Sequence, residues 1–112
     1  MEKRIVEITQ TALADMEEIY DYIADVLLAV ENAMGQYNRI ADAILTLESN
    51  PERCPFFEAE PEQSWRMRRM VIDNYLVCYI VDQDKVTVTD VLYGASNVHV
   101  RLKARHMSEP DT

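Results

Sequence analysis

Residues 65–81 read WRMRRMVIDNYLVCYIV, an arginine cluster that leads directly into two alternating apolar runs. The runs, Met67–Ile72 and Tyr75–Val81, are rich in β-branched and aromatic residues, which favour strands. Asp73 and Asn74 stand between them and suit a tight turn between antiparallel strands. The stretch therefore predicts a β-hairpin that carries positive charge at its start.

Two amphipathic helices are predicted upstream of this hairpin. Apolar residues recur every three or four positions from Ala12 to Val30, and carboxylates occupy the remaining arc. A second stripe runs from Tyr37 to Leu47, after a short link predicted near residues 31–35. It ends before Pro51, because the residue before a proline disfavours helical geometry. The two helices are expected to form a hairpin.

Two further strands complete the predicted sheet. Lys3–Ile8 precedes the first helix, for which Thr9 or Thr11 can act as the N-cap, and Lys85–Tyr93 follows the second strand of the β-hairpin after a turn. The order β-α-α-β-β-β predicts an α+β fold, in which an antiparallel sheet of about four strands packs on the N-terminal helical hairpin. The other face of the sheet is expected to be open to solvent or to a partner.

Length and composition bound the remaining organisation. The chain has 112 residues, which fits one domain, predicted over residues 1–102 with a flexible C-terminal tail over 103–112. The charged start MEKRIVEITQ and the short apolar runs predict neither a secretion signal nor a membrane span, so a cytoplasmic protein is expected. Cys54 and Cys78 are interpreted as reduced thiols, and neither a metal nor a cofactor is predicted.

Charge is distributed unevenly along the chain. The formal net charge is -9, and nearly all of the acidity lies in residues 1–64. An acidic chain is repelled by phosphate backbones at long range, so a nucleic-acid role would depend on the local charge of the arginines in residues 66–69. The alternative for these arginines is ion pairing with Glu58, Glu60 or Glu62 of the preceding loop.

Four segments in the correct order resemble the RelE/ParE superfamily of toxins from bacterial type II toxin–antitoxin systems, also described as plasmid stabilisation proteins. They are ADMEEIYDYIAD at 14–25, LTLESNP at 45–51, RMVIDNYLVCYIV at 68–81 and VTDVLYG at 88–94. The resemblance covers roughly residues 3–102. It implies a toxin that inhibits growth and is neutralised by a cognate antitoxin, which would cover the helical hairpin and the open sheet.

The superfamily has two branches that differ in mechanism. RelE-like members cleave messenger RNA on the ribosome without a metal, whereas ParE-like members inhibit DNA gyrase. In the nuclease branch the central strand carries an arginine where this chain has Leu76, and a leucine cannot stabilise charge at a phosphate. Basic residues expected after the last strand are also missing, since residues 94–97 read GASN. The resemblance is therefore closer to the ParE-like branch.

Two alternatives to gyrase inhibition stay open. One is a RelE-like ribosome-dependent endoribonuclease, with the ribosome and messenger RNA as partners and with a rearranged catalytic set formed by Arg66, Arg68, Arg69, Tyr93 and His99. Of these, Arg68 matches an arginine that recurs in the family. The other is an inactivated member that only binds an antitoxin. A homodimer is a further possibility under each interpretation.

Overall fold

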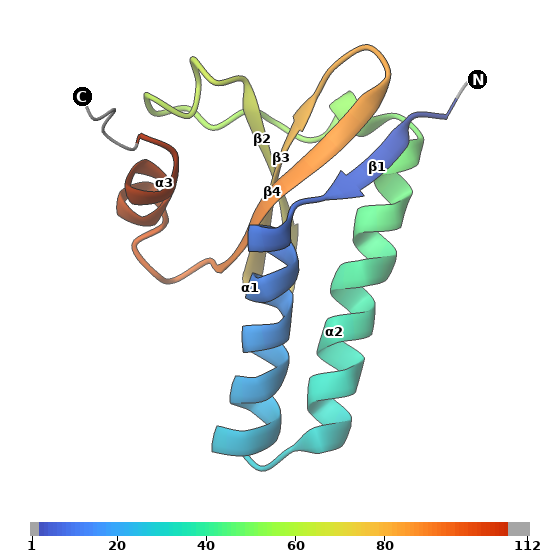
Figure 1. Ribbon diagram of the computed structural model, residues 1–112, viewed down its shortest axis with the longest axis vertical. Helices are drawn as coiled ribbons and strands as arrows, with labels where there is room; N and C mark the ends of the chain where they lie inside the picture. The colour runs from blue at the N-terminus through green and yellow to red at the C-terminus, as the bar shows by residue number, and fades with distance from the viewer. Residues whose placement is uncertain (1–2, 108–112) are drawn as a thin grey trace.

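The computed structural model describes residues 3–107, which form a four-stranded sheet with three helices (Figure 1). The strands are β1 (Ile5–Ile8), β2 (Met67–Ile72), β3 (Tyr75–Val81) and β4 (Lys85–Tyr93), in the order β1-β4-β3-β2. The helices are α1 (Gln10–Asp21), α2 (Val30–Leu45) and α3 (Val98–His106). The predicted α+β class and the helical hairpin are confirmed.

The three C-terminal strands are antiparallel, with the bounds that the sequence predicts. β1, in contrast, pairs with β4 in parallel, with Ile5 opposite Lys85 and Ile8 opposite Val88. A parallel partner requires a long crossover, and the whole helical hairpin and the β2–β3 hairpin lie between these two strands in the sequence. The first strand of the sequence, β1, therefore lies next to the last strand, β4.

The helical hairpin turns earlier than the sequence predicts. Thr9 caps α1 as expected, since its hydroxyl accepts a hydrogen bond from the Ala12 amide at 3.1 Å. α1 then continues into a π-helical turn, Tyr22–Val26, and the chain reverses before Val30. The link predicted near residues 31–35 is wrong, because these residues form the first turns of α2. The actual reversal contains Leu28, whose φ of 55° is left-handed.

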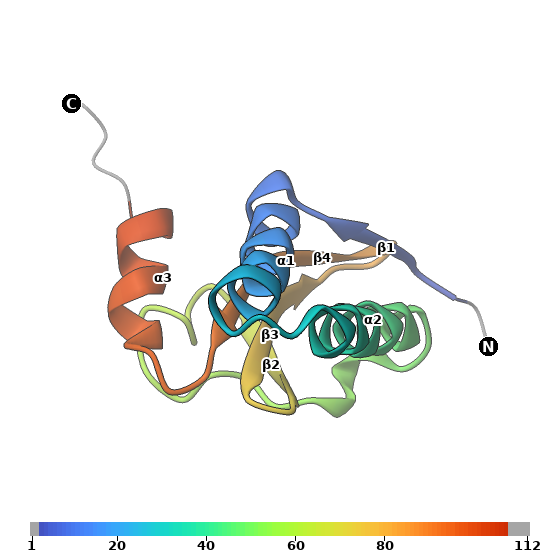
Figure 2. The same ribbon diagram turned by 90° about the horizontal axis from the view of Figure 1, so that it is seen from below.

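The main core lies between the helical hairpin and one face of the sheet. Its buried residues come from α1, α2, the 3₁₀ turn Thr46–Glu48 that follows α2, and the strands β2, β3 and β4: Ala12, Met16, Ile40, Ile44, Leu47, Met70, Val77, Tyr79, Val86, Val88 and Val91. Tyr75 packs on the same cluster, as the alternation along β3 predicts. Figure 2 shows α1 and α2 side by side, both seen nearly end-on.

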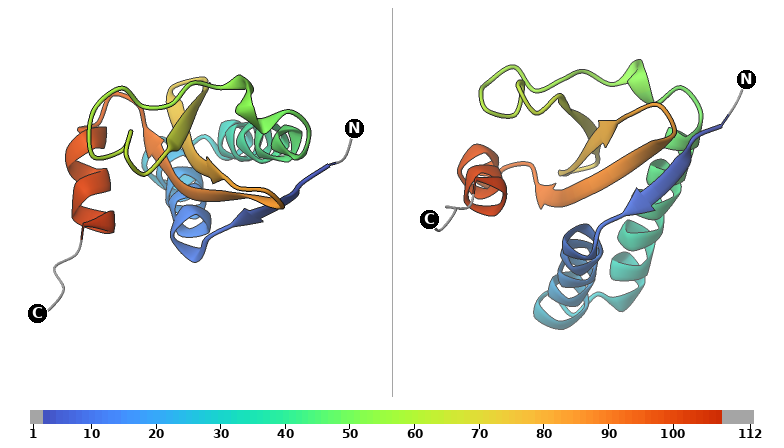
Figure 3. Two further views of the ribbon diagram at one scale, coloured as in Figure 1. Left: turned by 90° about the horizontal axis from the view of Figure 1, so that it is seen from above. Right: turned by 45° about the horizontal axis from the view of Figure 1, so that its top comes forward.

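The second face of the sheet is also covered, which corrects the prediction of an open face. Met67, Cys78 and Leu92 of the sheet pack against Leu102 of α3 in a second buried cluster. Trp65, in the loop that leads into β2, packs on the same cluster. Both views in Figure 3 show this loop next to α3.

The flexible tail predicted from Lys103 is wrong as far as the described residues extend. α3 continues to His106, and its last residues bind the sheet, whereas residues 108–112 of the predicted tail lie outside the described part of the chain. Cys54 and Cys78 are free thiols. Within residues 3–107, no helix is long and apolar enough to cross a membrane.

Candidate functional site

Within residues 3–107, the end of the helical hairpin carries a run of exposed apolar side chains. We call this surface the hairpin tip, and it consists of Tyr22, Val26, Leu27, Leu28, Val30 and Met34. Leu28 is 83% exposed, and its left-handed φ is costly for a residue with a Cβ atom. Exposed apolar patches of this kind on soluble proteins commonly mark interaction sites.

A groove of about 490 Å³ adjoins the hairpin tip, between α1, the ends of β3 and β4, and α3. Tyr22 and Leu27 of the tip line it, as do Tyr75 and Tyr93, whose rings are 5.8 Å apart. Burial, and then the neighbouring Tyr93, raises the pKa of the Tyr75 hydroxyl. Arg101 of α3 stands at the groove as well. The groove next to the exposed tip is thus lined by aromatic side chains.

The electrostatic setting of the hairpin tip is acidic, although Arg101 of α3 lines the groove. No lysine or arginine occurs from residue 5 to residue 38, a segment that carries Glu17, Glu18, Asp21, Asp25 and Glu31 in and around the hairpin. A partner with positive charge around an apolar surface would complement this arrangement.

The predicted arginines Arg66 and Arg68 meet at one aromatic ring. The Arg68 guanidinium lies 4.0 Å from the centre of the Phe56 ring and the Arg66 guanidinium 4.9 Å from it. Arg68 Nη1 also donates hydrogen bonds to the carbonyl oxygens of Glu52 at 3.0 Å and Cys54 at 2.6 Å. The Arg68 side chain therefore fastens the loop before β2 to the sheet.

Arg69, Tyr93 and His99 lie elsewhere. Arg69 faces Phe57, with 5.9 Å between the guanidinium carbon and the ring centre. Tyr93 ends β4 in register with Tyr75, at the opposite end of β3 from the partner of Arg68. The structure therefore brings Arg66 and Arg68 together and leaves the other three predicted residues in separate environments.

His99 pairs with Glu62, a loop carboxylate that the sequence offers as an ion-pair partner for the arginines. His99 Nδ1 lies 2.8 Å from Glu62 Oε2, and the Glu62 side chain is 1% exposed. Glu60 instead accepts hydrogen bonds from the amide and the hydroxyl of Ser64. No ion pair between these loop glutamates and the arginines of 66–69 occurs within residues 3–107.

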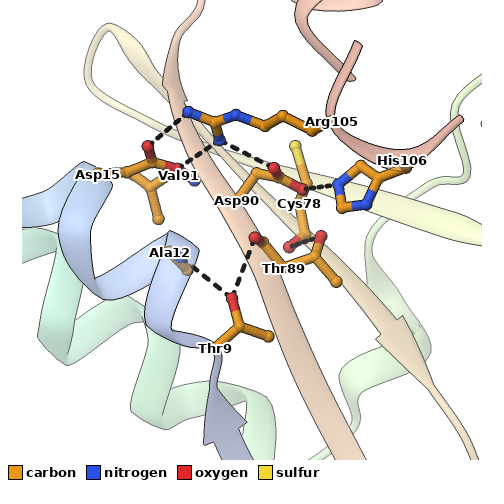
Figure 4. Close-up of polar contacts among 9 residues, drawn as sticks. All are labelled: Thr9, Ala12, Asp15, Cys78, Thr89, Asp90, Val91, Arg105 and His106. Atoms are coloured by element: carbon orange, nitrogen blue, oxygen red, sulfur yellow. Dashed lines mark hydrogen bonds and ion pairs between the residues drawn. The ribbon is translucent and has the colours of Figure 1, made fainter. Parts of the chain in front are cut away.

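A buried ionic cluster joins α1, β4 and α3 (Figure 4). Arg105 donates two hydrogen bonds to Asp15, both at 2.8 Å, and one to Asp90 at 2.9 Å. His106 Nε2 lies 2.8 Å from the other oxygen of Asp90, and the Val91 amide donates to Asp15. The hydrogen bonds to Asp15 and Asp90 raise the pKa of Arg105. Because both carboxylates are buried, the cluster fixes the position of α3 on the sheet.

The sequence pattern alone does not predict this ionic cluster. One signal was available: Asp90 stands between apolar residues in the strand VTDVLY, and a buried carboxylate needs a cationic partner. Its partners are remote in the sequence, so the pattern alone does not name them. Among residues 3–107, no group of three or more His, Cys, Asp and Glu side chains is placed to hold a metal ion.

The chain is similar to known proteins both in sequence and in fold. The sequence model described as "ParE toxin of type II toxin-antitoxin system, parDE" matches residues 6–98. A solved structure entitled "Chromosomal ParDE TA system from P. aeruginosa" is similar in fold, with a TM-score of 0.68 and 18% sequence identity. The similarity covers 81% of this chain and 96% of that chain. No curated protein sequence matches significantly. Because the family model spans most of the residues, the chain belongs to the ParE toxin family of type II toxin–antitoxin systems.

Proposed function

We propose that this protein is a growth-arresting toxin that inhibits DNA gyrase by surface contact and is neutralised by a cognate antitoxin bound over the hairpin tip and its groove. The observation that carries the antitoxin part is the hairpin tip itself. It presents six exposed apolar side chains beside an aromatic groove, an arrangement that a partner segment could cover.

The acidic surroundings define the chemistry of the bound segment. Every charged side chain from residue 5 to residue 38 is negative, so the antitoxin segment is expected to carry lysine or arginine beside its apolar residues. Such charge pairing would increase the rate at which the antitoxin and the toxin associate at low ionic strength. Added salt would remove this increase.

Membership of the ParE toxin family, rather than a catalytic centre, supports the proposal that gyrase is the target. A nuclease of the alternative type would need Arg66, Arg68, Arg69, Tyr93 and His99 around one phosphate. Arg68 instead binds two loop carbonyls and His99 binds a buried carboxylate. A guanidinium already engaged with the backbone is less available to stabilise charge on a reacting phosphate.

The test is tightly controlled expression of the chain in bacteria, alone and together with the antitoxin. We expect growth arrest that the antitoxin relieves, accompanied by gyrase-trapped DNA breaks and loss of supercoiling by purified gyrase. Cleaved transcripts without DNA breaks would support the ribosome-dependent nuclease. Normal growth with abundant folded protein that still binds the antitoxin would support an inactivated member.

A further inference from the structure

Arg66, the residue before β2, carries an exposed guanidinium that no carboxylate neutralises by direct contact. The guanidinium carbon lies 4.9 Å from the centre of the Phe56 ring, which holds the side chain by a cation–π contact. Within residues 3–107, Arg66 takes part in no ion pair. The side chain is therefore oriented by the protein while its charge stays available to a partner.

The backbone at Arg66 is left-handed, with a φ of 60°. Its amide donates a hydrogen bond to the Gln63 carbonyl at 3.0 Å and so closes the turn that leads into β2. Glycine adopts this φ freely, whereas a residue with a Cβ atom adopts it at a cost in free energy. Unfavourable backbone conformations of this kind are concentrated at functional sites. The presence of an arginine here indicates that its side chain has a use.

A pocket of about 340 Å³ lies beside this guanidinium. Its charged lining consists of three arginines, Arg4, Arg66 and Arg68, and two carboxylates, Glu52 and Asp82. Both carboxylates already have partners, because Glu52 pairs with Arg4 at 2.7 Å and Asp82 accepts hydrogen bonds from two backbone amides of the turn before β4. The three arginines outnumber the two carboxylates, so the pocket has one positive charge in excess.

The pocket and the hairpin tip lie at opposite ends of β3. Val81, the last residue of the strand, lines the pocket, whereas Tyr75, the first, lines the groove beside the tip. A strand of this length separates the two surfaces by about 20 Å. The tip is acidic and calls for a basic partner, but the pocket calls for an acidic one. The two surfaces therefore suit different partner segments.

We propose that this pocket is the contact surface for the target, where Arg66 binds a carboxylate of an acidic surface segment of gyrase while the hairpin tip is left to the antitoxin. The inference rests on the proposed gyrase inhibition. A carboxylate suits Arg66 because the guanidinium fork binds it through two parallel hydrogen bonds. A nucleic-acid backbone suits the pocket less well, because Glu52, Asp82 and the net charge of -9 repel an extended row of phosphates.

Inhibition of DNA supercoiling by purified gyrase tests the proposal on the full chain. Arg66→Gln should need about tenfold more toxin for half-maximal inhibition, because arginines that anchor a partner are common hot spots. Arg66→Gly should lose inhibition to the same extent and unfold at no lower temperature than the parent, because glycine accepts the left-handed φ. The control Arg39→Gln removes the same charge from α2, where Arg39 pairs with Asp73, and should inhibit like the parent. Calorimetry should show unchanged antitoxin binding by Arg66→Gln.

Each alternative outcome overturns the proposal in a distinguishable way. If both Arg66 variants inhibit gyrase like the parent, the pocket is not the contact surface, although gyrase inhibition itself stands. A parent that does not inhibit gyrase removes the proposed function and this inference together. Weaker antitoxin binding by Arg66→Gln would assign the pocket to the antitoxin. Binding of duplex DNA by the parent alone, lost in Arg66→Gln, would identify a phosphate as the ligand. An equal loss of inhibition in Arg39→Gln would indicate a general effect of charge.

Discussion

Arg105 of α3 and Asp15 of α1 are 90 positions apart and form a two-pronged ion pair, Nη1 to Oδ2 and Nη2 to Oδ1, each at 2.8 Å. Asp90 shares the same guanidinium from β4. Replacing Arg105 by Gln should destabilise the protein by about 3 kcal/mol, because two buried carboxylates lose their common cation. Urea unfolding measures the effect. Arg101→Gln should stay within about 0.5 kcal/mol of the parent, and an equal loss in both variants would contradict the role of the pair.

The buried hydrogen bond of the Tyr79 hydroxyl gives a second prediction about the stability of the protein. It donates a hydrogen bond to the Pro51 carbonyl at 2.7 Å inside the core, where burial, and then the nearby Cys54, raises the pKa of this phenol. Tyr79→Phe should cost about 1 to 2 kcal/mol, because the carbonyl is left buried without its donor. Thermal unfolding checks this. A Tyr20→Phe variant serves as the control and should be close to neutral.

The two cysteines should differ in reactivity. Cys78 is fully buried, and its thiol has a pKa raised by burial and by Asp90, so the reactive thiolate is scarce at neutral pH. Iodoacetamide at about pH 8 should leave Cys78 unmodified in the native protein and modify it in denaturant. Peptide mass spectrometry follows both cysteines. Rapid native labelling of Cys78 would indicate that α3 and the sheet separate readily.

Asp73 gives a pH prediction with a defined sign. The hydrogen bond from Arg39, and then that from Gln36, lowers the pKa of this exposed carboxyl. A lowered folded-state pKa contributes stability above the unfolded-state value, and the contribution is lost as pH falls through the folded-state value. NMR titration should show the pKa of Asp73 rising toward its ordinary value in Arg39→Gln. The Arg53→Gln variant should leave it unchanged, and no shift in either would refute the assignment.

The hairpin tip can be tested with matched leucines at the two ends of the hairpin. Leu27 is 55% exposed at the tip, and Leu45 is 61% exposed at the other end of α2. If the antitoxin covers the tip, Leu27→Ser should weaken its binding about tenfold or more, because a buried leucine contributes roughly 1.5 to 3 kcal/mol. Calorimetry of the purified complex measures this. Leu45→Ser should bind like the parent, and equal losses would place the antitoxin elsewhere.

The parts of the fold that the sequence predicts correctly are those with local causes. β2, β3 and β4 have the predicted bounds because β-branched alternation and the turn residues Asp73 and Asn74 act within a few positions. The hairpin reversal was misplaced because Leu28, whose φ of 55° is left-handed, is not a typical turn residue. α3 was missed because its sequence, VHVRLKARH, buries one leucine and depends on remote carboxylates.

The candidate site could also be predicted only in part from the sequence. An arginine cluster at the start of β2 could be read directly from residues 66–69. Arg68 binds the carbonyl of Cys54 and stacks on Phe56. These contacts depend on the path of an irregular loop back to the sheet, and the periodicity of the sequence does not predict that path. The exposed tip was likewise invisible, because the apolar stripe of a helix does not reveal which of its residues extend beyond the sheet.

The parallel pairing of β1 with β4 has a consequence for synthesis of the protein. Thr9 binds the carbonyl of Thr89, 80 positions later, and the Asp15–Arg105 bond spans 90 positions, so β1 and α1 cannot complete these contacts before β4 and α3 are made. A nascent chain on the ribosome can form the helical hairpin but not the closed sheet, and contacts of such long range slow folding. Co-translational folding would therefore delay the completed sheet until β4 and α3 have emerged, which gives a partner made at the same time an interval in which to bind the nascent chain.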